Sequence, residues 1–250
     1  MEYVTGFLIA LAIGLTGVGG GTITAPVLML FFNLPPAQAV GTALTFTAAV
    51  KLLAAPLHLY RGHVNFRVLG YLFLGGLPGV LVGSLLLDHM TSTGRNALLS
   101  AVLGATIAIT ALINLFRMSQ TAGPRPGKDR AGWLSALALP IGAEVGFSSA
   151  GAGALGTLAL FSLTSLTAAQ VVGTDLTFGL GLSLVGGGIQ FSAGNYHGMT
   201  LVKLIAGGLA GALVGTHLAG VLPSRVLRAA LCVWLVTLGG QLCWTAVRHW

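Results

Sequence analysis

The sequence predicts an all-α membrane protein with about eight membrane-spanning helices in two related halves, and three observations lead to this prediction. Of the 250 residues, 55% are hydrophobic and only 7% are charged, whereas a soluble domain carries about 25% charged residues. The apolar runs are about 20 residues long, the length that one helix needs to cross a bilayer, and they do not alternate as strands of a membrane barrel would. The third observation is an internal repeat.

Eight apolar segments follow one another along the chain, at residues 4–33, 37–59, 68–88, 96–117, 132–164, 168–192, 199–220 and 226–247. Between the fourth and fifth lies MSQTAGPRPGKDRA, which has two prolines, two glycines and four charges and is expected to be an exposed loop. We therefore predict a first four-helix unit over 1–117, a cytoplasmic linker over 118–131 and a second four-helix unit over 132–250.

The two units are copies of each other. Residues 14–84 align with 146–216 without a gap, and about 24 of these 71 positions are then identical. We call this shift of 132 residues the repeat register and apply it along the whole of both units. The best-matched stretch pairs AQAVGTALTF (37–46) with AQVVGTDLTF (169–178). Compositional bias towards Gly and Leu does not account for such a match.

The distribution of basic residues predicts the orientation. If all eight segments cross the membrane, eight Lys and Arg residues lie on the side of the linker and both termini, and three lie on the other side. The excess predicts that the linker and both termini are cytoplasmic. Four crossings per unit would make the copies parallel, whereas one re-entrant segment per unit would make them inverted.

The first segment of each unit is too long for one crossing and carries glycines at the same place. As a single helix, residues 4–33 would span about 45 Å, against a hydrocarbon core of about 30 Å. GVGGG (17–21) and GAGALG (151–156) therefore indicate a broken helix, or else a site of close helix packing. A break would start a half-helix near Thr22 or Ile23, with free N–H groups at membrane depth and Pro26 in an early turn.

The order of these motifs resembles the sulfite exporter TauE/SafE family of membrane permeases. The resemblance rests on GLTGVGGGTITAP (14–26), AVGTALT (39–45), RGHVNF (61–66) and GGLPGVLVGSLL (75–86), and on their recurrence in the second half. It implies a secondary transporter of small sulfur-containing anions such as sulfite, thiosulfate or organosulfonates. The second copy has Leu158 where the first has Pro26, so the first copy is the better candidate for binding.

Polar residues within the apolar segments are candidates for function because they are costly at membrane depth. Lys51 either meets the anion, or snorkels or pairs with a carboxylate. Two sets of polar side chains each share a helical face and suit a substrate path or interhelical hydrogen bonds. They are Gln38, Thr42 and Thr45 in the first unit and Gln170, Thr174 and Thr177 in the second. The candidate substrate-binding residues are Gly17, Gly19, Gly20, Gly21, Thr22, Gln38, Thr42, Thr45, Lys51, Ser148, Ser149, Gly151, Gly153, Gln170, Thr174 and Thr177.

Glu144, Asp175 and His58 are the candidates for a group that carries a coupled proton, and either carboxylate would equally serve to neutralise Lys51. Asp175 would lie about 12 Å from Lys51 in depth if the copies were parallel. We expect alternating access at the interface of the units, in a bacterial inner membrane.

The composition also sets expectations for other classes of protein. The net charge of +7 is explained by orientation in the membrane, so we expect no nucleic-acid partner, and we expect neither a cofactor nor a metal. The partners are then a small anion and the lipid bilayer, with a homo-oligomer left open. The alternatives are an intramembrane serine hydrolase that uses Ser148 and His217, which needs both side chains to meet in the fold, and a non-transporting membrane assembly protein.

Overall fold

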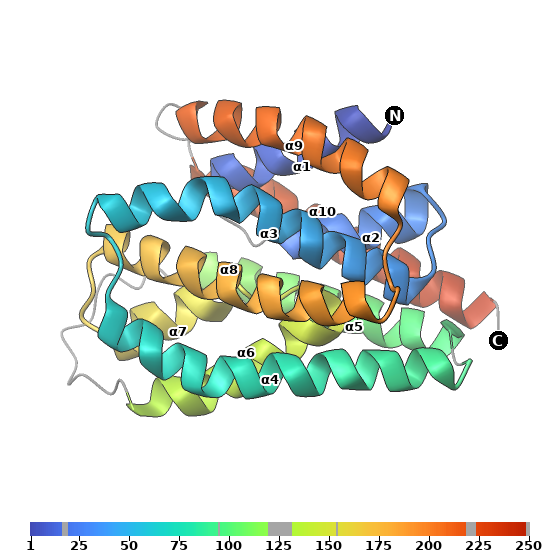
Figure 1. Ribbon diagram of the computed structural model, residues 1–250, viewed down its shortest axis with the longest axis horizontal. Helices are drawn as coiled ribbons and strands as arrows, with labels where there is room; N and C mark the ends of the chain where they lie inside the picture. Colours follow the sequence, from blue (N-terminus) through green and yellow to red (C-terminus); the bar gives the residue numbers. More distant parts are fainter. Residues whose placement is uncertain (17–19, 95, 120–131, 154, 219–223, 249–250) are drawn as a thin grey trace.

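The computed structural model describes residues 1–16, 20–94, 96–119, 132–153, 155–218 and 224–248, and within these ranges the chain is helical and contains no strand. Figure 1 shows the helices in a roughly aligned bundle. Their bounds are α1 (Glu2–Thr16), α2 (Gly20–Phe31), α3 (Pro36–Tyr60), α4 (Phe66–Ser92), α5 (Asn96–Ser119), α6 (Gly132–Ser148), α7 (Leu155–Leu163), α8 (Ala168–Ser192), α9 (Gly198–Leu218) and α10 (Ser224–Arg248).

Six of the described helices are long and apolar enough to cross a membrane, namely α3, α4, α5, α8, α9 and α10. This differs from the expected eight crossings. The first and fifth apolar segments each contain two shorter helices instead, α1 with α2 and α6 with α7. The direction of each short helix follows from its neighbours.

The first short pair folds back on itself. α1 runs parallel to α9, because Gly207 packs on Tyr3 and Gly211 packs on Phe7, so residue numbers rise together in both helices. α2 runs the opposite way, since its first residue, Gly20, packs on Thr47 in the middle of α3 and its last residues lead directly into the start of α3. α1 and α2 therefore form a hairpin.

The second short pair folds back in the same way. α6 runs parallel to α4, because Gly75 packs on Ser135 and Gly79 packs on Leu139. α4 in turn runs parallel to α8, whereas α7 is antiparallel to α8: Gly156 of α7 contacts Asp175, and the end of α7 leads into the start of α8. α6 and α7 are thus a second hairpin (Figure 1).

The remaining central helices are antiparallel pairs. Gly41 near the start of α3 packs on Gln190 near the end of α8, while Gly179 of α8 packs on Lys51 further along α3. α5 and α10 are also antiparallel, since Cys243 donates to the carbonyl of Ala101 at the start of α5. In the repeat register, α3 corresponds to α8 and α5 corresponds to α10.

Many tertiary contacts of one unit recur at the equivalent positions of the other, as the repeat register defines them. They include the glycine contacts Gly75–Ser135 and Gly207–Tyr3, Gly79–Leu139 and Gly211–Phe7, Gly83–Ala143 and Gly215–Leu11, Gly76–Phe178 and Gly208–Phe46, and Gly41–Asn195 and Gly173–His63. The hydrogen bonds from Asn65 N–H to Thr174 and from His197 N–H to Thr42, each 3.0 Å long, are another such pair. A glycine in these positions lets two backbones approach closely, the usual basis of helix packing in membranes.

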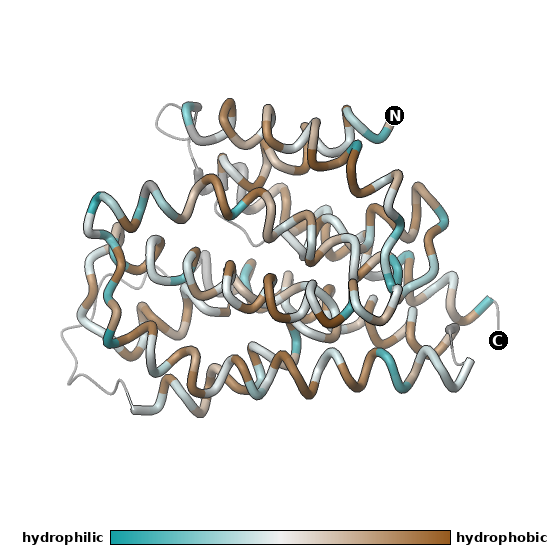
Figure 2. The backbone as a smooth tube through the Cα atoms, viewed as in Figure 1, coloured by the Kyte–Doolittle hydropathy of each residue, from teal (hydrophilic) through white to brown (hydrophobic). Residues whose placement is uncertain are grey.

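The bundle has two polar ends. We call the end where α5 stops and α6 starts the linker end, and the end where α1 starts and α10 stops the terminal end (Figure 1). The end of α5 and the start of α6, which flank the linker, lie at the opposite end of the bundle from the start of α1 and the end of α10, whereas the sequence analysis expected the linker and both termini on one side. Hydrophilic residues gather towards both ends, and few lie between them, as Figure 2 shows.

Candidate functional site

The start of α2 meets the turn of the second hairpin in the interior of the bundle. Gly21 at the start of α2 packs on the backbone and hydroxyl of Ser149, which follows the last residue of α6. Residues 149–153 leave the helical conformation, with positive φ values of 63° at Ser149, 93° at Gly151 and 106° at Gly153. Glycine adopts such values without strain, which explains the two glycines in this turn.

The described part of the first hairpin turn begins at Gly20, and Gly17 and Gly19 lie outside the described residues. α2 starts there, slightly before the start near Thr22 or Ile23 that the sequence suggested, and Pro26 lies in its second turn. Gly20, Gly21 and Thr22 are all buried. Because α2 and α7 both begin in the interior, the positive ends of two helix dipoles lie there.

Lys51 lies beside this meeting point, in the middle of α3. Its side chain is 6% exposed, and its ammonium group contacts the backbone of Gly179 on α8. Ala152, from the turn of the second hairpin, lies against the same glycine. Among the described residues no carboxylate is within 4.0 Å of the ammonium nitrogen. A buried cation at this depth is costly, which makes Lys51 a candidate for function.

Asp175 is the nearest carboxylate along α8, four residues before Gly179. It is 4% exposed, it receives a hydrogen bond from the N–H of Gly153, and it contacts Gly156 of α7. Its Oδ1 atom is buried without a hydrogen-bond partner in the described part of the chain. Four residues are about one helical turn, so Lys51 and Asp175 are much closer than the parallel arrangement suggested.

Two hydroxyl groups at the start of α2, those of Ser149 beside Gly21 and Thr47 beside Gly20, are buried without a partner among the described residues. The sequence analysis named Ser149 as a candidate substrate-binding residue, whereas it did not name Thr47. Thr47 precedes Lys51 by four residues and so shares its face of α3, which is the signal that would have identified it. Ser148 uses its hydroxyl locally, donating to Glu144 O at 3.0 Å and accepting from Ala150 N at 3.2 Å.

The duplicated polar faces lie nearer the two ends and hold the scaffold together. Thr42 accepts a hydrogen bond from the N–H of His197, in the loop before α9, and Thr174 accepts one from the N–H of Asn65, in the loop before α4. Thr45 and Thr177 donate to carbonyl oxygens of their own helices, at 2.9 Å to Gly41 and 2.8 Å to Gly173. Gln170 caps the start of α8 together with Thr167, and its counterpart Gln38 is half-buried near the start of α3.

The two other proton-carrying candidates lie apart from Lys51. Glu144 is half-buried on α6, accepts a short hydrogen bond from Thr110 of α5 and contacts Gly151. His58 lies near the linker end of α3, with its ring centroid 5.8 Å from that of His63. The described residues contain no group of three or more His, Cys, Asp or Glu side chains that would hold a metal ion.

The residues of the hydrolase alternative are not joined by the fold. Ser148 is fully buried beside the second hairpin turn, whereas His217 is exposed near the end of α9. No hydrogen bond links them in the part of the chain that the structure describes. A serine nucleophile needs a base within hydrogen-bonding reach, so the contacts do not favour a hydrolase.

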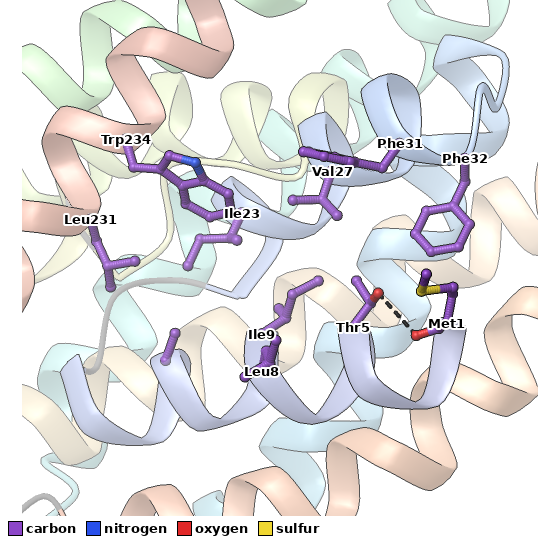
Figure 3. Close-up of a pocket in the computed structure, with 11 residues that line it drawn as sticks. Met1, Thr5, Leu8, Ile9, Ile23, Val27, Phe31, Phe32, Leu231 and Trp234 are labelled. Atoms are coloured by element: carbon purple, nitrogen blue, oxygen red, sulfur yellow. Dashed lines mark hydrogen bonds between the residues drawn. The ribbon is translucent and has the colours of Figure 1, made fainter.

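A separate apolar cavity of about 520 Å³ lies between the arms of the first hairpin. Figure 3 shows Leu8 and Ile9 of α1 facing Ile23 and Val27 of α2, with Trp234 of α10 at one side. None of the residues expected to bind substrate lines this cavity. Its apolar walls suit hydrocarbon better than an anion.

The helical bundle, with a buried charged pair at its centre, is that of a membrane transporter. The chain belongs to the sulfite exporter TauE/SafE family, whose profile matches residues 3–242. It is 28% identical over 246 residues to the probable membrane transporter protein YjnA of Bacillus subtilis, covering 95% of this chain and 96% of that protein.

Two further relatives have similar names. The probable membrane transporter protein YdhB of Bacillus subtilis is 29% identical over 231 residues, covering 90% of this chain and 92% of that protein. A probable membrane transporter protein of Xylella fastidiosa strain 9a5c is 29% identical over 231 residues, covering 86% of this chain and 82% of that protein. No solved structure matches the chain.

Proposed function

We propose that this transporter carries small anions, of the sulfur-containing oxyanion or organosulfonate class, through a site where the start of α2 meets the turn of the second hairpin. The observation that carries the proposal is the buried ammonium group of Lys51, which has no carboxylate within 4.0 Å among the described residues. The same region contains the starts of α2 and α7. It also contains the hydroxyls of Ser149 and Thr47, which have no hydrogen-bond partner among the described residues. Together they would replace the water that an anion loses on entering the membrane. The family description supports the choice of sulfur oxyanions.

The architecture that we propose is two inverted repeats, each of one re-entrant hairpin and three crossing helices. The contacts that recur in the repeat register support the repeat, with units over 1–117 and 132–250 joined by the linker 118–131. The antiparallel packing of α3 on α8, which are equivalent helices, supports the inversion. Equivalent helices run in opposite directions only when the symmetry axis lies in the membrane plane.

The positive-inside rule then gives an orientation that differs from the first expectation. The segments at or next to the linker end contain eight basic residues: Arg61, Arg67, Arg117, Arg125, Lys128, Arg130, Arg225 and Arg228. Those at or next to the terminal end contain three: Arg95, Lys203 and Arg248. We propose that the linker end faces the cytoplasm of a bacterium and that both termini face the opposite side.

Alternating access follows from this geometry. Each hairpin is tied by glycine contacts to a helix of the other repeat, α1 to α9 and α6 to α4. Each hairpin would move together with the helix of the other repeat on which it packs, so a rocking movement at the interface of the repeats would shift both hairpins. Because the site lies between the turns, the movement would open it first to one end and then to the other.

The experiment is anion exchange in proteoliposomes. Vesicles loaded with unlabelled thiosulfate, sulfite or sulfoacetate should take up the same labelled anion by counterflow, and Lys51→Ala should reduce this uptake at least tenfold. Lys203→Ala is the matched control, because Lys203 forms a partly exposed ion pair with Glu2 at the terminal end, and such a pair contributes little. Absence of counterflow for every anion, or equal loss in both variants, would refute the proposal.

A further inference from the structure

Lys51 and Asp175 come from different repeats and have no charged equivalents in the other copy. The repeat register places Ser183 at the position of Lys51 and Ala43 at the position of Asp175. The scaffold around them is repeated, with Gly20 on Thr47 in one half and Ala152 on Gly179 in the other. Lys51 and Asp175 therefore lie on the equivalent helices α3 and α8 and are two charged residues among contacts that are otherwise repeated.

The charge balance of this pair limits what the site can hold. Both side chains are buried, at 6% and 4% exposure, and together they are neutral when both are ionised. An anion that approaches Lys51 would leave the site with an excess negative charge, close to the carboxylate of Asp175. Like charges in a poorly solvated interior repel strongly, and an excess charge there is costly.

We infer that Asp175 takes up one proton when an anion binds to Lys51, so that the transporter moves one proton with each anion. This inference rests on the proposed function. The incoming proton forms an O–H bond on the carboxylate, the ammonium group keeps its protons, and the site gains one negative and one positive charge. The unpartnered Oδ1 of Asp175 is available to the proton, while the N–H of Gly153 continues to bind the carboxyl group.

Other titratable groups lie on the elements packed against α8, and they are the competing proton carriers. The α3 side contributes His58 as well as Lys51, and His63 follows in the loop, where its backbone packs on Gly173. α6 contributes Glu144, and α7 contributes none. α4 contributes Arg67 near its start, Tyr71, and Asp88 and His89 near its end. Asp175 differs from these groups because Gly179, one turn further along the same helix, contacts the ammonium group of Lys51.

The test is calorimetric titration of the purified protein with thiosulfate near neutral pH, in two buffers with different heats of protonation. The difference between the buffers gives the number of protons taken up per anion bound. The wild type should take up about one, and its affinity should rise as the pH falls, by at most about tenfold per pH unit for one linked proton. Asp175→Asn should bind thiosulfate without proton uptake and without this pH dependence.

Two variants serve as controls. Glu144→Gln and the double variant His58→Gln/His63→Asn should each still take up about one proton. The double variant copies Gln190 and Asn195, which stand at the matching positions of the second repeat and are joined by a 2.8 Å hydrogen bond.

Thiosulfate binding without proton uptake in the wild type would overturn the inference and leave the proposed function standing. Loss of uptake in either control, or persistence in Asp175→Asn, would also overturn it. If thiosulfate, sulfite and sulfoacetate all fail to bind to the wild type, the proposed function falls and the inference falls with it.

Discussion

Gly179→Ala tests the position of the anion site without changing any charge. A methyl group at Gly179 would overlap the ammonium group of Lys51, so the flexible lysine has to retreat, and the methyl group would also lie 3.3 Å from the Cβ of Ala152. Normal contact distances require a movement on the order of 1 Å. The substitution therefore moves the cation most, and Ala152 has to shift by only a few tenths of an ångström.

The size of the effect follows from Coulomb's law. At an effective dielectric constant of about 20, a unit charge about 4 Å from an anion contributes about 4 kcal/mol, and one about 5 Å away contributes about 3.3 kcal/mol. The difference of about 0.8 kcal/mol corresponds to a roughly fourfold rise in Kd. Gly179→Ala should therefore be a mild version of Lys51→Ala, which removes the whole attraction.

The assay is calorimetric titration of each purified variant with thiosulfate, after gel filtration and a thermal melt confirm that it is folded. Gly188→Ala is the control, because Gly188 lies on the same helix and a methyl group there would meet no described atom within 4 Å. The control should bind thiosulfate with the affinity of the wild type. Equal Kd values for Gly179→Ala and Gly188→Ala would show that the ammonium group beside Gly179 does not hold the anion.

Three further predictions concern the scaffold. A cysteine replacing Thr93 at the terminal end should react with a membrane-impermeant maleimide added to intact cells, and one replacing Arg61 at the linker end should react only after permeabilisation; the opposite pattern would reverse the proposed orientation. Gly75→Ala should lower the free energy of unfolding by about 1–3 kcal/mol, because its methyl group would meet the backbone of α6. Gly70→Ala is the control, because a methyl group there has open space, and its thermal melt in detergent should match that of the wild type. Thr174→Val should cost about 1–3 kcal/mol in the same melts by leaving the N–H of Asn65 unpaired, and an unchanged melting temperature would contradict this role.

The sequence predicted the helical class and the register of the repeat, because both depend on patterns that a linear search detects. The register that aligns Gly75 with Gly207 in the sequence also relates their contacts in the fold. The direction of the chain after each glycine turn was harder to predict. A segment of about 30 apolar residues fits a tilted crossing or a hairpin of two short arms equally well, since hydropathy measures length and not direction.

The same limit applies to the contacts of single side chains. Thr45 shares a helical face with Thr42, which suggested a substrate path, but its hydroxyl bonds to the carbonyl of Gly41 in its own helix. Such local bonds are common for threonine in helices and leave no mark in the sequence. The proximity of Lys51 and Asp175 could not be foreseen either, because it depends on the antiparallel packing of α3 and α8.

In the inverted-repeat architecture that we propose, a single anion site requires the asymmetry of Lys51 and Asp175. A residue on α3 near the symmetry axis has its counterpart on α8 close by, so a duplicated lysine would place Lys51 beside a second cation at position 183. Two buried cations would bind an anion tightly and would repel each other when it leaves. Serine at 183 and alanine at 43 avoid this, and Asp175 supplies the opposite charge instead. In this proposal the repeated contacts supply the scaffold and its movement, and the binding of the anion depends on positions where the two copies differ.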